Sequence, residues 1–213
     1  MNQTKTKRII QIIYPILIYF TVYQVGAGFL ISLYAEKIGR LMCLLIAALV
    51  CILPIYAIYR NISGLNPVPI KNAKQIFLYG LSIVLIVAFG IALNVLMTRS
   101  GIIEQSEGFS KANQTLSDGS MLIKILCNVI AIPVLEEILI RGIIAGQLLL
   151  WHGPFVAVVT SAICFGIIHN NIVQFIYALL VGLALGILFV KTKRLSLCFA
   201  AHGLINLIVI LFS

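Results

Sequence analysis

The sequence predicts an all-α, polytopic transmembrane bundle of about seven helices. Of its 213 residues, 62% are hydrophobic and 10% are charged, whereas soluble domains are about 45–50% apolar and about 25% charged. The apolar residues also gather in runs of roughly the 20 residues that a helix needs to cross the hydrocarbon core. A soluble fold of this length could not bury so much apolar surface, so the bilayer is the expected partner of the chain.

Seven apolar runs follow one another, and each is expected to be helical because lipid offers no partner to backbone polar groups. The first run follows Lys5, Lys7 and Arg8 but is too long for a signal peptide, so it is expected to stay as a helix. The fourth run is long and is interrupted by Pro133. The expected helices are Ile9–Tyr34, Leu41–Tyr59, Ile76–Met97, Met121–Leu150, Pro154–His169, Ile172–Val190 and Leu195–Phe212.

One long polar segment, residues 98–120, separates the third and fourth expected helices. Ser, Gly, Asn and Gln are frequent in it, which is typical of a solvent loop that can include a short helix at the membrane surface.

The basic residues indicate a topology and not a nucleic-acid partner, although the net charge is +9. They lie in short loops between apolar runs, where they suit anionic head groups and determine orientation. With the N-terminus in the cytoplasm, nine lie on the inner side and four on the outer side. The inner residues are Lys5, Lys7, Arg8, Arg60, Lys71, Lys74, Lys191, Lys193 and Arg194, and the outer residues are Lys37, Arg40, Arg99 and Lys111.

Ionisable side chains inside the apolar runs are the strongest indication of function. Each costs roughly 2.5–3.5 kcal/mol at the centre of a membrane helix, so each is expected to face a partner or a wet cavity. Glu137 and Arg141 are four residues apart and can pair on one helix face. Glu136 is rotated by about 100° from Glu137 and can point elsewhere.

Four further polar or aromatic positions follow the same logic. His202 and Asn206 are four apart and form a polar stripe, while Phe165 and His169 share another face. Pro133 lacks an N–H, so it leaves a carbonyl of the preceding turn without its helical donor. Taken singly, each residue also fits a purely structural role, as a buried ion pair or a hydrogen bond between helices.

Together, these side chains match the needs of hydrolysis. A carboxylate or imidazole base can take a proton from water, and a nearby donor can stabilise the oxyanion that develops.

The polar residues form three motifs in order. Glu136, Glu137 and Arg141 form an EExxxR motif, Phe165 and His169 an FxxxH motif, and His202 and Asn206 an HxxxN motif. In order, separation and apolar setting the chain resembles the CAAX protease and bacteriocin-processing (CPBP, or Abi) family over roughly residues 123–206.

The resemblance implies an intramembrane endopeptidase, a metallo- or glutamate peptidase. By analogy, Glu136 and His169 would activate water, and His202 and Asn206 would stabilise the oxyanion. Glu137, Arg141 and Phe165 would support them. A zinc ion on Glu136, His169 and His202 is one option, since two His and one Glu form a plausible ligand set; a metal-free glutamate mechanism is the other.

The resemblance also implies a division of the chain. Residues 1–120 would hold the N-terminal transmembrane helices and a polar extracytoplasmic loop, and residues 121–213 the catalytic helical core, within one membrane domain. The expected substrate is a peptide or membrane protein, including a CAAX-like or bacteriocin-related one, at a bacterial plasma membrane. Two alternatives remain at this stage: a non-catalytic bacteriocin-immunity or scaffold protein, and a small proton-coupled transporter, because buried Glu and His also relay protons.

Overall fold

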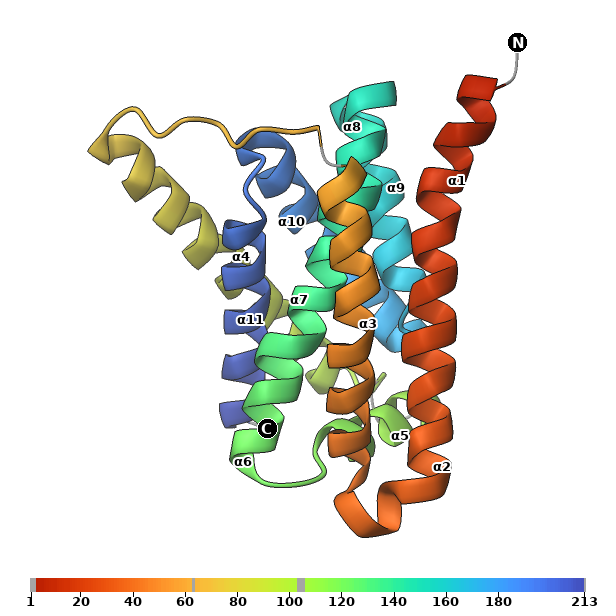
Figure 1. The fold of residues 1–213 in the computed structure, drawn as a ribbon. Helices are drawn as coiled ribbons and strands as arrows, with labels where there is room; N and C mark the ends of the chain where they lie inside the picture. Colours follow the sequence, from red (N-terminus) through yellow and green to blue (C-terminus); the bar gives the residue numbers. More distant parts are fainter. Residues whose placement is uncertain (1–2, 63, 103–105, 213) are drawn as a thin grey trace.

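The computed structural model describes residues 3–62, 64–102 and 106–212, which form helices and no strands. Most helices run along one common direction, and the two termini lie at opposite ends of the bundle (Figure 1). The helical segments are α1 (Gln3–Ile18), η1 (Tyr19–Val25), α2 (Gly26–Ile38), α3 (Arg40–Ile62), α4 (Ala73–Arg99), α5 (Glu107–Leu116), α6 (Met121–Lys124), η2 (Ile125–Ala131), α7 (Ile132–Glu137), η3 (Ile138–Ala145), α8 (Gly146–His152), α9 (Pro154–Ile167), α10 (Ile172–Thr192) and α11 (Leu195–Phe212).

The first rod consists of α1, the π-helical stretch η1 and α2, which follow one another without a break. Its turn into α3 falls at Gly39, whose φ of 84° favours glycine. The backbone N–H of Arg40 donates to the Asp118 carboxylate at 2.7 Å. This hydrogen bond ties the start of α3 to the polar segment that precedes α6.

A central rod runs from Met121 to His152 through α6, η2, α7, η3 and α8. It contacts α1, α3, α9, α10 and α11, and the side chains of Leu135, Leu139 and Ile143 are fully buried. Two π-helical stretches, η2 and η3, flank the short α7 that carries both glutamates. Such π-helical stretches are frequent at functional sites because they rotate side chains out of the regular α-helical register.

The predicted all-α membrane bundle is confirmed, with two refinements. Five helical stretches are long and apolar enough to cross a membrane: Arg8–Ile38, Arg40–Ile62, Ala73–Arg99, Ile172–Thr192 and Leu195–Phe212. The central rod is not among them because its interior carries buried charges. The fifth predicted helix is a shorter one, at Pro154–Ile167.

The polar segment between α4 and α6 contains a helix of its own, α5, and Ser106 caps its N-terminus through the Phe109 N–H at 3.2 Å. Residues 103–105 of this segment lie outside the described residues. No side chain of α5 is fully buried, although Leu116 at its end packs against the hydrophobic core.

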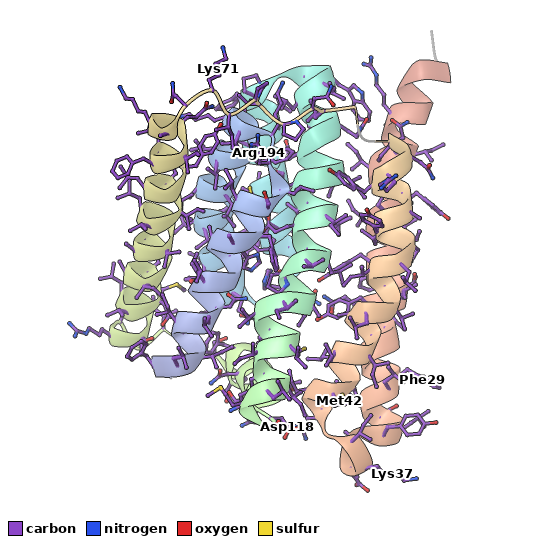
Figure 2. The ribbon with its side chains drawn as sticks, turned by 60° about the vertical axis from the view of Figure 1, so that its left-hand side comes forward. Phe29, Lys37, Met42, Lys71, Asp118 and Arg194 are labelled. Carbon is purple, nitrogen blue, oxygen red and sulfur yellow. The ribbon has the colours of Figure 1, made fainter. Side chains whose placement is uncertain are left out.

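The loops predicted to be cytoplasmic and those predicted to be external lie at opposite ends of the bundle. Lys71 and Arg194 lie at one end, and Lys37 and Asp118 lie at the other (Figure 2). At the Lys71 end, Arg194 Nη2 donates to the Val68 carbonyl at 2.8 Å and connects the α10–α11 turn to the α3–α4 loop. Which end faces the cytoplasm stays a prediction.

Candidate active site

A buried ion pair lies at the centre of the bundle, as the four-residue spacing predicted. Arg141 Nη1 is 3.2 Å from Glu137 Oε1, and both side chains are almost fully buried. Arg141 Nη2 also donates to the Gly182 carbonyl of α10 at 3.2 Å, and its guanidinium lies 4.4 Å above the Phe165 ring. One cation therefore connects the central rod to α9 and α10.

His202 lies between the two neighbouring glutamates. Its Nδ1 is 2.9 Å from Glu137 Oε1, and its Nε2 is 3.8 Å from Glu136 Oε2. Because a carboxylate accepts, Nδ1 is the protonated nitrogen of this pair. The interaction with Glu137 was not predicted from sequence, since it joins residues 65 positions apart.

His169 lies just beyond the end of α9, in the turn that leads to α10. Its Nδ1 is 2.8 Å from the Phe165 carbonyl oxygen, which can only accept a hydrogen bond. A neutral imidazole held in this way carries its proton on Nδ1 and keeps the Nε2 lone pair free, as a general base requires. The Phe165 ring contacts both imidazoles edge-on, with centroid distances of 5.1 Å to His169 and 5.5 Å to His202.

Asn206 is joined to the backbone of the central rod. Its Nδ2 donates to the Asn128 carbonyl at 2.8 Å. Pro133 has no N–H, so one carbonyl of the preceding turn lacks its helical donor. That carbonyl is the one of Val129 in an α-helix and the one of Asn128 in a π-helix. Asn206 supplies the missing donor across the helix interface, and one amide proton remains for another acceptor.

Gly203 lets α11 approach the same stretch of backbone. A Cβ at Gly203 would lie 2.9 Å from the Val129 carbonyl oxygen, which belongs to the backbone and cannot turn away. Gly203→Ala is therefore expected to lower the free energy of unfolding by about 1–3 kcal/mol, measured by denaturation in detergent micelles. The control is Gly80→Ala, where a Cβ meets nothing within 4 Å and alanine improves helix propensity. Equal stability of Gly203→Ala and wild type would contradict the close approach.

The four residues predicted as catalytic line one cavity of about 580 Å³. They are Glu136, His169, His202 and Asn206, from the central rod, the α9–α10 turn and α11. His169 and His202 are close enough to Glu136 to interact with its charge. The structure thus brings all four side chains together, while their chemical roles stay predictions.

The first hundred residues contribute polar side chains to this cavity, which sequence reasoning did not predict. Tyr19, Tyr23 and Gln24 of the first rod line it, and Asn94 of α4 does so as well. The available signal was the presence of polar groups within apolar runs, with Tyr19 and Tyr23 one helical turn apart. Asn128 of η2 is a further lining residue that sequence reasoning missed.

The predicted zinc site requires three ligand side chains that face one position. Within residues 3–62, 64–102 and 106–212, no three His, Cys, Asp or Glu side chains are arranged to hold a metal ion. Nδ1 of His202 and Nδ1 of His169 are each engaged in a hydrogen bond. Zinc on Glu136, His169 and His202 stays a prediction.

Fold and site together define a class: a polytopic membrane protein with a buried carboxylate–imidazole cluster open to an internal cavity. Residues 118–208, which contain all three motifs, match the family model described as type II CAAX prenyl endopeptidase Rce1-like. Over these residues, which make up less than half of the chain, the protein is similar to the CAAX protease and bacteriocin-processing family that its motifs predicted.

One curated relative is similar over part of the chain. It is the Bacillus subtilis (strain 168) protein named "Putative membrane peptidase YdiL", which is 33% identical over 79 residues. The match covers 37% of this chain and 32% of the relative, so the chain spans about a third of that protein's length. No solved structure matches the chain at a significant level.

Proposed function

We propose that this protein is a membrane endopeptidase that hydrolyses peptide bonds of membrane-associated substrates. The observation that carries the proposal is the cavity that both Glu136 and His169 line, with Nδ1 of His169 hydrogen-bonded to the Phe165 carbonyl. The similarity of residues 118–208 to a family model described as a prenyl endopeptidase supports it, and so does similarity to a protein named as a membrane peptidase.

The proposed reaction uses a water molecule held by Glu136 and His169. Its oxygen attacks the scissile carbonyl carbon while one of the two groups accepts the proton. The carbonyl oxygen becomes an oxyanion, stabilised by His202 Nε2–H and by the free amide proton of Asn206. The proton then passes to the amide nitrogen, the C–N bond breaks, and the products are a carboxylic acid and an amine.

The supporting residues would keep this arrangement neutral and rigid. Arg141 balances the charge of Glu137, and a protonated His202 between Glu136 and Glu137 would balance the second carboxylate. A neutral cluster matters because an uncompensated charge is costly at low dielectric.

A peptide that reaches a cavity within an apolar bundle must itself enter the membrane or carry a lipid. A farnesylated peptide with a C-terminal CAAX sequence and an unlipidated leader peptide of a bacteriocin type are the two substrate classes to compare.

The test is comparative peptidomics of membranes that contain wild-type protein, His169→Ala or His152→Ala. Wild type and His152→Ala are expected to release the same peptides, because His152 ends α8 and is not among the cavity-lining residues. His169→Ala is expected to lose about 10²-fold or more of the cleavage rate, as for the removal of a general base. Assays on the two synthetic substrate classes then define specificity.

Controls separate loss of chemistry from loss of fold. His169→Ala should insert and show a wild-type unfolding midpoint in detergent. Full turnover by a well-folded His169→Ala protein would refute the proposal and favour a non-catalytic role such as immunity, while solute flux in liposomes would favour transport. The metal content of the purified protein, measured by mass spectrometry, checks the zinc prediction separately.

A further inference from the structure

Two tyrosines of the first rod are buried against the cavity, although this rod mostly faces outward. Tyr19 and Tyr23 are 2% and 6% exposed, whereas their neighbours Phe20 and Val25 are 52% and 55% exposed. Both tyrosines belong to η1 and line the cavity that contains Glu136. They also lie close enough to Glu136 to interact with its charge.

The first rod is held in this position beside His169. Gln24 Nε2 donates to the Ile168 carbonyl at 2.9 Å, and Asn170 Nδ2 donates to Gln24 Oε1 at 3.3 Å. These two bonds attach the first rod to the residues on either side of His169. The Tyr19 and Tyr23 rings pack on each other with centroids 5.1 Å apart, so the Tyr23 ring has little freedom to move.

Several polar atoms of the cavity already have partners within the bundle. Nδ1 of His169 and Nδ1 of His202 each make a hydrogen bond, and Asn206 Nδ2 donates one hydrogen bond to the Asn128 carbonyl. The Tyr19 hydroxyl lies beside the Gln24 side chain. In contrast, the Tyr23 hydroxyl has no hydrogen-bond partner within the described part of the chain. This hydroxyl is not among the fully buried atoms that lack a partner, and Tyr23 lines the cavity, so an acceptor that enters the cavity can reach it.

We propose that Tyr23 is a further catalytic residue, whose hydroxyl donates a hydrogen bond to the carbonyl oxygen of the bound peptide as it becomes an oxyanion. The inference rests on the proposed peptidase function and deepens it. Tyr23 would add a hydrogen-bond donor for the oxyanion beside Asn206, which already donates one hydrogen bond to the Asn128 carbonyl. It also gives the N-terminal helices, which lie outside the residues matched by the family model, a part in the chemistry.

The test compares Tyr23→Phe with Tyr14→Phe in the full-length protein. Tyr23→Phe keeps the ring and its contact with Tyr19 but removes the donor. We expect kcat to fall about 10²-fold or more, as for loss of an oxyanion-hole donor, with little change in KM. Tyr14 lies on the same rod and is 55% exposed, so Tyr14→Phe should behave as wild type. The probe is a peptide cleaved by wild-type membranes in the peptidomic comparison.

A second measurement separates catalysis from packing. A peptide aldehyde of the same sequence forms a tetrahedral adduct with water and resembles the transition state. Tyr23→Phe should weaken inhibition by this aldehyde by about the same factor as kcat, because the lost contact acts mainly in the transition state. Binding of the peptide with a reduced, uncleavable bond should stay unchanged.

The outcomes distinguish this inference from the function on which it rests. An active wild type with fully active Tyr23→Phe would refute the role of Tyr23 and leave the peptidase proposal intact. A fall in kcat that is matched by weaker binding of the uncleavable peptide would show a binding role and also refute the inference. A wild type without any cleavage would refute both proposals together.

Discussion

Replacing Glu136 with glutamine is expected to lower kcat by about 10³-fold or more, near the upper range for loss of a general base. Glutamine keeps the size of the side chain and its ability to hydrogen-bond, but it cannot accept a proton from water. Glu136 lines the cavity and, unlike Glu137, makes no close pair with Arg141, being 3.8 Å from His202 Nε2. The measurement is single-turnover cleavage by detergent-purified protein.

The matched control for this variant is Glu36→Gln. Glu36 lies near the end of α2 and is exposed to solvent, so the same chemical change there should leave kcat unaltered. Unfolding midpoints of both variants should match wild type within error. Activity of Glu136→Gln within about twofold of wild type would be incompatible with a role of Glu136 in activating the water.

Replacing Arg141 with methionine is expected to destabilise the bundle by about 3–5 kcal/mol, the usual effect of removing one partner from a buried ion pair. The change leaves the Glu137 carboxylate buried without its cation. It also removes the hydrogen bond to the Gly182 carbonyl and the contact with the Phe165 ring. Denaturant titration in mixed micelles measures the loss.

A double-mutant cycle tests whether the ion pair is the cause. Glu137→Gln removes the unpaired charge, so Arg141→Met combined with Glu137→Gln should be less destabilised than the two single changes added together. The expected coupling is about 1–3 kcal/mol for groups in direct contact. Additive effects would mean that Arg141 stabilises the bundle through Gly182 and Phe165 alone.

The helices and their order were predictable because hydropathy and segment length are properties of the chain itself. The predicted spans Leu41–Tyr59, Ile172–Val190 and Leu195–Phe212 agree with α3, α10 and α11 to within a few residues. The Glu137–Arg141 pair was predictable for the same reason, since a four-residue spacing brings two side chains together on any helix. The π-helical stretches around α7 were not predictable, because they depend on how neighbouring helices pack.

The sequence by itself determined that the chain lies in a membrane, that its costly polar groups gather in three late helices, and that these groups follow one family's order. Only the tertiary structure decided which polar atoms meet. It brought His202 to Glu137, Asn206 to the Asn128 carbonyl, and Tyr23 of the first rod to the cavity that Glu136 lines. The physical reason is that contacts between helices depend on their relative rotation and depth, which side-chain packing over the whole bundle sets and no local spacing records.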